Sequence, residues 1–359
     1  MHPNLEAGVR NLLFQCADIK TGERLLLVGE KDCQPFFDPK LCDVVAAVAR
    51  SHGIDTTILL ALPGNDASEF PEAVSSAMQT ADVSLFFSRL GDQVRFIDSP
   101  GPGRKIMSYT LTLEHLGAWF SNIDFRVMKQ IHDHLLDQIM QSTVYSIKAK
   151  NGTDLKATIR QTSSAKKPAI SEFSLELFPV MIFPPVNFFD LHGRLVMEHF
   201  LLSSSTRAYA DSEFYFDSPV TAIVEMSRMI DFEGDQQLIK RLKKQLERAA
   251  AITGGDPYCL NSWHTGINPY TFYNEEPYAN LERWGTVAYG SPRYTHIHAA
   301  GIDPGDISIQ LFDATISFDQ QIFWEQGKFM FFDQPEVQTL LQQSDAQLPD
   351  ASSYLGIGL

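Results

Sequence analysis

Cysteine is scarce in this sequence, and its few thiols follow no pattern typical of a disulfide framework or a zinc site. Only four occur, at Cys16, Cys33, Cys42 and Cys259, and no two of them form a C-x-x-C pair. Small secreted domains that depend on disulfides carry cysteines at dense spacing. We therefore expect reduced thiols and a cytoplasmic location, with no disulfide scaffold.

Positive charge and long apolar runs are also lacking. The 29 lysines and arginines are outnumbered by 44 acidic residues, which gives a formal net charge of -15. Because nucleic-acid backbones bind positive surfaces, no nucleic-acid partner is expected. No run approaches the roughly 20 apolar residues of a membrane helix, and the first residues show no signal-peptide pattern. We expect no membrane partner either.

Two common catalytic motifs are missing. The first strand-like run leads into Val28–Asp32, which offers no G-x-G-x-x-G turn for a dinucleotide pyrophosphate. The chain contains no G-x-S-x-G elbow, and no cysteine lies in a recognisable nucleophile context. Neither a dinucleotide site nor covalent catalysis is indicated.

The chain is long and apolar enough for about two domains. It has 359 residues, of which 44% are hydrophobic and 25 are phenylalanine, and single cores usually stop growing below this length. Along residues 1–145, apolar runs alternate with segments of helical spacing. The strand-like runs are Arg24–Gly29, Thr56–Leu60, Val83–Phe87 and Lys105–Tyr109, and the helical segments are Pro39–Ser51, Glu69–Thr80 and Ile123–Met140. This order predicts an α/β domain with a parallel sheet flanked by helices.

From about residue 146 the pattern becomes rich in strands and loops. One helix interrupts it at Asp235–Ala251, where Leu238, Ile239, Leu242 and Leu246 form an apolar stripe. The strand-like segments are Ser146–Lys150, Leu155–Arg160, Phe183–Asn187, Arg194–Met197 and Val220–Met226. Residues 146–359 are therefore predicted to form a β-rich α+β domain, and we expect this domain to bind metal and carry out catalysis.

Histidines at alternate positions suggest a metal site in this second domain. If Tyr294–His298 is a strand, His296 and His298 point to the same face and can reach one ion. His264 is a candidate third ligand from a loop, and neutral imidazoles suit Fe, Zn, Cu or Ni. The alternative is a pair of ordinary surface or core histidines on a strand.

The remaining histidines with notable spacing are weaker candidates. His132 and His134 lie in a predicted helix, where side chains two residues apart diverge by about 200°. His192 and His199 flank a predicted strand and have no convergent partners in the sequence. We expect surface positions for all four.

Three stretches resemble, in order, segments of one protein family. Ala17–Val28 is similar to the family's opening turn and first strand, Asn151–Leu155 to its entry into the second domain, and Pro185–Gly193 to the loop before its next strand. On these segments the chain resembles the thermophilic metal-dependent aminopeptidases and their relative 2,5-dihydroxypyridine 5,6-dioxygenase, a mononuclear non-haem iron enzyme of the same fold. The resemblance covers most of the chain and implies that fold and a homodimer.

The resemblance also implies a ligand set. The aminopeptidases hold two metals with glutamates, histidines and a terminal H-x-D, whereas the dioxygenase holds one metal with a loop histidine and the H-x-D. By this resemblance His264 matches the loop histidine, and His296 and His298 fall on H-x-D, with His298 replacing the aspartate. A three-histidine triad can still hold Fe(II) with open positions. Two-metal hydrolysis needs bridging carboxylates, for which the remaining candidates are Glu225, Glu233, Glu275 and Glu276.

The leading hypothesis is an iron-dependent oxygenase acting with O2 on a small aromatic or electron-rich substrate. Arg293 is a candidate clamp for a substrate carboxylate, and Tyr294 and Thr295 are candidates for proton transfer. The aromatic residues that we expect to wall the pocket are Trp263, Tyr270, Tyr273, Trp284 and Tyr294. The alternatives are an aminopeptidase or amide hydrolase that uses zinc or cobalt, and a catalytically inactive binding protein of the same fold.

Overall fold

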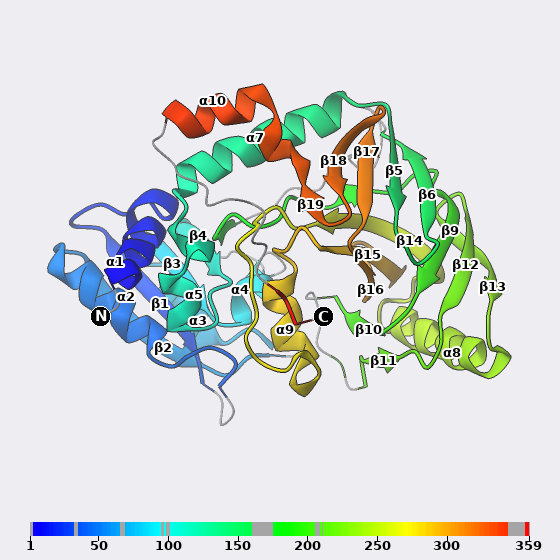
Figure 1. The fold of residues 1–359 in the computed structure, drawn as a ribbon. Coiled ribbons are helices and arrows are strands. Elements are labelled where there is room, and N and C mark those ends of the chain that lie inside the picture. Colours follow the sequence, from blue (N-terminus) through cyan, green and yellow to red (C-terminus); the bar gives the residue numbers. More distant parts are fainter. Residues whose placement is uncertain are drawn as a thin grey trace.

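Two β-sheets of different kinds organise the chain. The structure is a computed structural model that describes residues 3–31, 35–64, 69–94, 97, 101–159, 175–204, 209, 211–343 and 356–358. In Figure 1 the smaller, parallel sheet and its helices lie on the left, and the larger, antiparallel sheet lies on the right. The predicted fold class, an α/β unit followed by a β-rich unit, is confirmed.

Five parallel strands form the smaller sheet in the order β2-β1-β3-β4-β7. They are β1 (Arg24–Glu30), β2 (Asp55–Ala61), β3 (Val83–Phe87), β4 (Arg104–Ser108) and β7 (Glu176–Phe178). All residues of β3 and the five inner residues of β1 are buried. A strand covered on both faces needs such a continuous apolar run, which is why these strands are visible in the sequence.

The chain returns once to this sheet after leaving it. β5 (Val144–Lys148) and β6 (Asp154–Thr158) already belong to the larger sheet. The later strand β7 then pairs with β4, with Glu176 opposite Ile106. The chain thus first crosses to the larger sheet at β5, and β7 is a later return to the smaller one.

The larger sheet is antiparallel, and its strands follow the order β11-β10-β16-β15-β14-β13-β12-β9-β6-β5-β17-β18-β19, with β8 paired to β14. Its further strands are β8 (Val186–Asn187), β9 (His192–Met197), β10 (Phe200–Ser203), β11 (Phe214–Tyr215), β12 (Val220–Glu225), β13 (Arg228–Glu233), β14 (Asp256–Thr265), β15 (Tyr294–Gly301), β16 (Ile307–Phe312), β17 (Thr315–Phe318), β18 (Gln321–Glu325) and β19 (Lys328–Phe329). All eight residues of β15 are buried, so this strand runs through the core.

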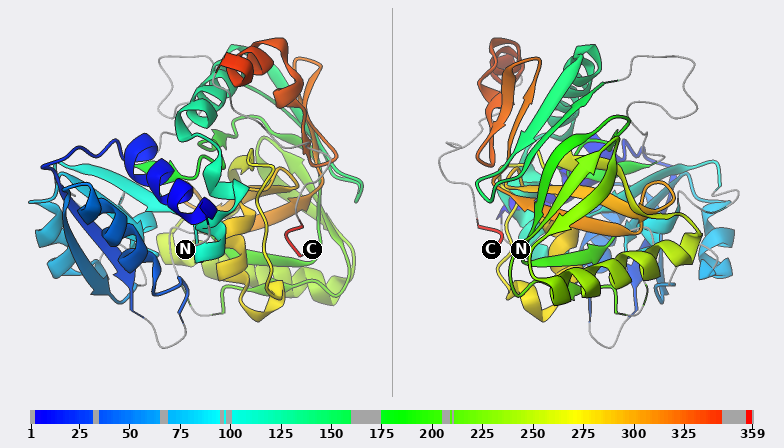
Figure 2. Two further views of the ribbon diagram at one scale, coloured as in Figure 1. Left: turned by 60° about the vertical axis from the view of Figure 1, so that its left-hand side comes forward. Right: turned by 90° about the vertical axis from the view of Figure 1, so that its right-hand side faces the viewer.

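Helices cover the sheets and fill the space between them. They are α1 (Pro3–Arg10) with the π-helical turn Asn11–Cys16, α2 (Leu41–Ser51), α3 (Glu72–Met78), α4 (Leu90–Gln93), α5 (Leu113–Gly117), α6 (Trp119–Asn122), α7 (Phe125–Gln141), α8 (Gln236–Thr253), α9 (Leu281–Ala288) and α10 (Pro335–Gln343), with 3-10 turns at Pro277–Ala279 and Met330–Asp333. Figure 2 shows α10 beside α7, and α9 lies between the two sheets in Figure 1. Among the described residues, no helix is long and apolar enough to cross a membrane.

Helix α8 supports the central strands of the larger sheet. It begins after Asp235, whose carboxylate accepts hydrogen bonds from the backbone N–H groups of Gln237 and Leu238 at 3.0 and 2.8 Å. It ends at Gly254, whose φ of 75° suits glycine. The predicted apolar stripe is buried, and the helix packs against β14 and β15.

Removing the carboxylate at the start of α8 should destabilise the fold. We expect Asp235→Ala to lower the free energy of unfolding in urea by about 1 kcal/mol, because two N–H groups lose their partner. Asp235→Asn keeps an oxygen acceptor and should retain most of the stability. Equal urea midpoints for Asp235→Ala and the unchanged protein would contradict this role.

Candidate metal centre

Three neighbouring strands bring the candidate ligands to one face of the sheet. β14 and β15 pair antiparallel with His264 opposite His296 and Ser262 opposite His298. On the other side of β15, β16 places Gln310 opposite His296. Because residues directly opposite in a sheet share a face, all these side chains point the same way.

His264 therefore lies within a strand, and its predicted place in a loop is wrong. Strand β14 continues to Thr265, and the loop residues Gly266, Asn268 and Pro269 come only after it. These turn-forming residues marked the end of the strand, and the sequence interpretation extended the loop too far back. The strand position fixes His264 opposite His296 more firmly than a loop could.

The three imidazoles lie close together and are buried. Ring centroids are 4.1 Å apart for His264 and His296, and 5.1 Å apart for each of the other two pairs. One ligand nitrogen from each ring can be chosen so that all lie within 4.8 Å of one another. Nitrogens bonded to one ion at about 2.1 Å, at angles of about 90–109°, lie about 3.0–3.4 Å apart, so the rings would have to move closer together on binding a metal. The residues fit a single ion.

Neighbouring groups orient two of the rings. The Phe183 carbonyl oxygen lies 2.9 Å from His264 Nδ1, and since a carbonyl only accepts, Nδ1 carries the proton and Nε2 the lone pair. His298 Nδ1 lies 3.3 Å from the Ser262 hydroxyl oxygen. Burial, with a smaller contribution from the two neighbouring imidazoles, lowers the pKa of His296 well below its usual value. A neutral imidazole is the form that binds metal.

Several buried polar atoms beside the rings lack a partner within the chain. In the described part of the structure, no well-aligned hydrogen bond is made by His296 Nδ1, the Tyr294 hydroxyl, the Ser308 hydroxyl or the side-chain amide of Gln310. Gln310 and Ser308 nevertheless lie close enough to the Tyr294 hydroxyl to act on its pKa, which they lower against the larger effect of burial. These four residues are at most 2% exposed. Buried polar groups are nearly always satisfied in proteins, so their concentration here indicates a place for water or a bound ligand.

The two neighbours of Tyr294 do not join this face. Thr295 alternates to the other side of β15, where its hydroxyl donates to the Thr265 hydroxyl at 2.9 Å. The Arg293 guanidinium makes a two-pronged ion pair with Asp313, through Nε at 2.8 Å and an Nη at 2.9 Å. The Asp313 carboxylate neutralises the charge of the Arg293 guanidinium within the protein.

Aromatic side chains surround the rings only in part as expected. The Tyr294 ring is stacked 5.8 Å from His296, and Trp284 lies edge-on to Tyr294 at 5.1 Å. Trp263 alternates to the other face of β14 and packs on Tyr145, and the other two predicted aromatics lie against different partners, with Tyr270 near Trp119 and Tyr273 near Arg283.

Sequence reasoning missed a tyrosine ring that packs against His296. Tyr289 directly follows α9, and its ring centroid lies 4.4 Å from that of His296. It also missed Ser308 and Gln310, although polar residues at alternate positions of the apolar strand Ile307–Phe312 are a recognisable signal of a special face.

The candidate carboxylates and the other histidines lie elsewhere. Among the described residues, His264, His296 and His298 form the one group whose ligand atoms converge. The carboxylates occupy other positions: Glu225 is exposed at the end of β12, Glu233 pairs with Arg194, Glu275 pairs with Arg283, and Glu276 caps the turn at Pro277. His132 was predicted to lie on the surface. It is instead buried, and its Nδ1 forms a hydrogen bond with the Asp133 carboxylate.

Two solved protein structures have a fold similar to that of this chain. No protein family and no curated protein matches the sequence. Among solved structures, 2,5-dihydroxypyridine dioxygenase from Pseudomonas putida KT2440 is similar with a TM-score of 0.60 and 14% identity, over 91% of this chain and 96% of that one. AmpT from Thermus thermophilus is similar with a TM-score of 0.51 and 8% identity, over 91% and 98%. The dioxygenase and the aminopeptidase expected from the sequence are thus distant relatives in fold.

The poorly aligned contacts of the Tyr294 hydroxyl lead to a test on stability. We expect Tyr294→Phe to change the free energy of unfolding of the metal-free protein by less than about 0.5 kcal/mol, because its hydroxyl makes no well-aligned hydrogen bond within the described residues. The matched control is Tyr109→Phe, which removes a buried hydrogen bond of 2.8 Å to Asp92 and should cost about 1–2 kcal/mol. Equal losses in the two variants, measured by urea unfolding, would show that Tyr294 has an internal partner.

Proposed function

We propose that this protein is an enzyme that holds one metal ion with His264, His296 and His298, and that the ion is Fe(II). The observation that carries the proposal is the convergence of three buried imidazoles on one face of β14 and β15. The fold similarity to a dioxygenase and to AmpT supports it. The reaction that we propose is oxygenation of a small aromatic or electron-rich substrate.

The donor set suits this metal and leaves positions open. Three imidazoles on adjacent strands would hold an ion from one side, as in the facial triads of non-haem iron oxygenases, here without the carboxylate. When bound, Fe(II) supplies open coordination positions and the redox capacity for reaction of a substrate with O2. The protein holds the rings in place through the Phe183 carbonyl and the Ser262 hydroxyl.

The residues beside the imidazoles have separate tasks in this proposal. Burial raises the pKa of Tyr294 well above its usual value, so its hydroxyl stays protonated and can donate a hydrogen bond to a substrate oxygen. The Gln310 amide offers both a donor and an acceptor, and Ser308 a hydroxyl. The aromatic rings of Tyr289 and Tyr294 exclude bulk water from His296.

A zinc-dependent hydrolase is the second candidate. Three histidines with an open fourth position also suit catalytic zinc, which activates a bound water for hydrolysis, and the AmpT-like fold is compatible with this use. A two-metal peptidase site is less well supported, because no carboxylate joins the three imidazoles among the described residues.

Metal analysis of anaerobically purified protein tests the proposal. We expect about one iron per chain, and loss of nearly all of it in His264→Ala and in His298→Ala, since each removes one of three ligands. His192→Ala, at an exposed position of β9, is the matched control and should keep the iron. Circular dichroism melting confirms that each variant is folded.

The other possible results decide between the alternatives. Stoichiometric zinc or cobalt, together with hydrolysis of leucine p-nitroanilide and no O2 uptake with 2,5-dihydroxypyridine, would replace the oxygenase by the hydrolase. Folded protein without any stoichiometric metal would contradict both and leave a binding protein.

A further inference from the structure

Helix α9 packs on the face of the larger sheet that carries the imidazoles. Trp284 of this helix lies edge-on to Tyr294 at 5.1 Å and to Phe200 at 5.5 Å. Tyr289 follows directly after the helix, and its ring centroid lies 4.4 Å from that of His296. Tyr294 and His296 are two residues apart on β15 and so share one face of the sheet. The helix and the residue after it therefore cover this face beside the metal centre.

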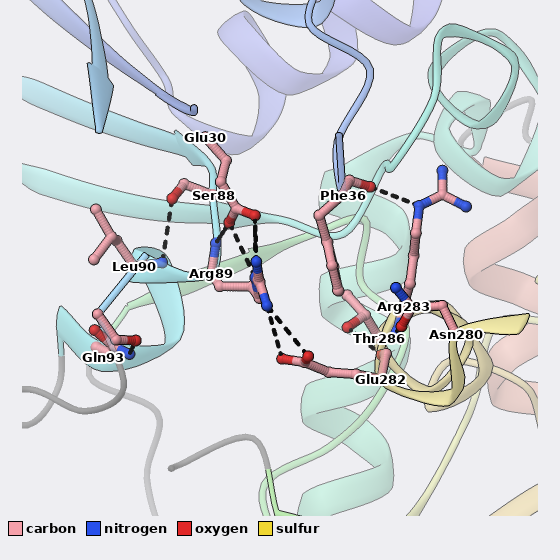
Figure 3. A network of polar contacts seen from close by, with 11 residues as sticks. Glu30, Phe36, Ser88, Arg89, Leu90, Gln93, Asn280, Glu282, Arg283 and Thr286 are labelled. Carbon is pink, nitrogen blue, oxygen red and sulfur yellow. Dashed lines mark hydrogen bonds and ion pairs between the residues drawn. The ribbon is translucent and has the colours of Figure 1, made fainter. Parts of the chain in front are cut away.

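Contacts with the parallel sheet hold the first turn of α9 in place. Arg89, two residues after β3, forms ion pairs with Glu282 at 3.2 Å and with the buried carboxylate of Glu30 at 2.7 Å. The next residue of the helix, Arg283, donates from Nε to the Phe36 carbonyl at 2.7 Å. Figure 3 shows Arg89 between its two carboxylates and Arg283 beside Phe36. The helix is thus fixed both to the parallel sheet and to the larger sheet.

A cavity of about 240 Å³ lies beside this helix. Its lining includes Thr286 and Tyr289 on the side of α9, and Leu202 of β10. Leu202 is opposite Ser308 on β16, and Ser308 is opposite His298 on β15. Because residues directly opposite in a sheet share a face, Leu202 belongs to the face that carries the imidazoles. The cavity therefore reaches the sheet surface on which the metal centre is built.

The Tyr289 ring borders both the cavity and the metal centre. It lines the cavity and is half-buried, whereas His296 beside it is 2% exposed. A side chain at a helical position leans back toward the start of its helix. Accordingly, the Tyr289 hydroxyl oxygen lies 3.6 Å from the place that a methyl group at Gly285 would occupy. The ring therefore extends along the cavity wall while it contacts the His296 imidazole.

The size of the cavity suits one aromatic ring. A dry protein cavity of about 150 Å³ already holds a benzene molecule, so the larger space here accommodates a six-membered ring with small substituents. To reach an ion held by the imidazoles from this space, a molecule passes the Tyr289 ring. The bulk of that ring then limits the width of what can approach the ion.

From these contacts we propose that Tyr289 is a specificity-determining residue. A molecule enters the cavity beside α9 and passes the Tyr289 ring, which admits a single aromatic ring to the imidazoles and keeps out larger ones. The volume of the tyrosine ring carries this selection, and its hydroxyl is not required. That the admitted molecule is a substrate rests on the proposed function, whereas the passage itself exists without a metal.

Chemical modification of His296 in the metal-free protein tests the passage. Diethyl pyrocarbonate modifies neutral imidazoles, and peptide mass spectrometry measures the rate at His296. We expect Tyr289→Ala to raise this rate about tenfold, and Tyr289→Phe to leave it unchanged. The matched control is Tyr278→Ala, which removes a tyrosine that is 45% exposed and is not among the described lining residues. Equal rates in Tyr289→Ala and the unchanged protein would overturn the proposal.

A block placed in the cavity gives a second test that leaves Tyr289 intact. Thr286→Cys keeps a side chain of similar size on the cavity wall, and N-phenylmaleimide then attaches a ring to it. We expect this label to slow modification of His296 about fivefold relative to the unlabelled variant. Unchanged protein treated with the same reagent controls for the native thiols. An unaltered rate after labelling would contradict the passage, even if Tyr289→Ala proves unable to fold in circular dichroism melting.

Co(II)-loaded protein tests the selection by size and separates it from the proposed function. Visible absorption follows the binding of imidazole and of 4-phenylimidazole to the metal. We expect the unchanged protein to bind 4-phenylimidazole about tenfold more weakly than imidazole, and Tyr289→Ala to lose this preference. If the protein holds no Co(II) but Tyr289→Ala speeds modification of His296, the proposed function fails and the passage remains. If Co(II) binds and is lost in His264→Ala, but Tyr289→Ala keeps the preference, the role of Tyr289 fails and the metal centre remains.

Discussion

His264 faces His296 because Ser262–Thr265 of β14 pair antiparallel with Thr295–His298 of β15 in continuous register, and the other features of the site follow from that pairing. The same register sets Ser262 beside His298 and, through β16, Gln310 beside His296. A slip of one residue turns every side chain of a strand to the opposite face, which here would separate His264 from the other two rings. Helix α8 packs against both strands and so fixes the sheet on which the site is built.

The buried face that results is polar where a core is normally apolar. Neutral imidazoles, a tyrosine hydroxyl, a serine hydroxyl and an amide lie together without a full set of internal hydrogen bonds among the described residues. Such an arrangement costs stability unless something else satisfies it. In the proposed function a metal ion with its small ligands offsets that cost, and a cavity lined in part by Tyr289 lies close to the imidazoles.

The parts of this structure that local sequence patterns determine were predictable. Apolar runs predicted β1, β2 and β3, helical spacing predicted α8, and the alternation of His296 and His298 predicted their common face. Features that depend on strand pairing could not be predicted, because pairing joins segments that are far apart in the sequence. The strand position of His264, the partners on β16 and the return of β7 to the parallel sheet belong to this class. The sequence suggested Arg293 as a clamp for a substrate carboxylate. Only the fold shows that its guanidinium forms an ion pair with Asp313.

X-ray absorption at the K-edge of the bound metal tests the central claim most directly. Three imidazoles around one ion predict a shell of nitrogen and oxygen neighbours at about 2.1 Å, with the multiple-scattering signature of about three histidine rings. A sulfur neighbour, the signature of one imidazole or none, or a second metal at about 3.5–4 Å would contradict it.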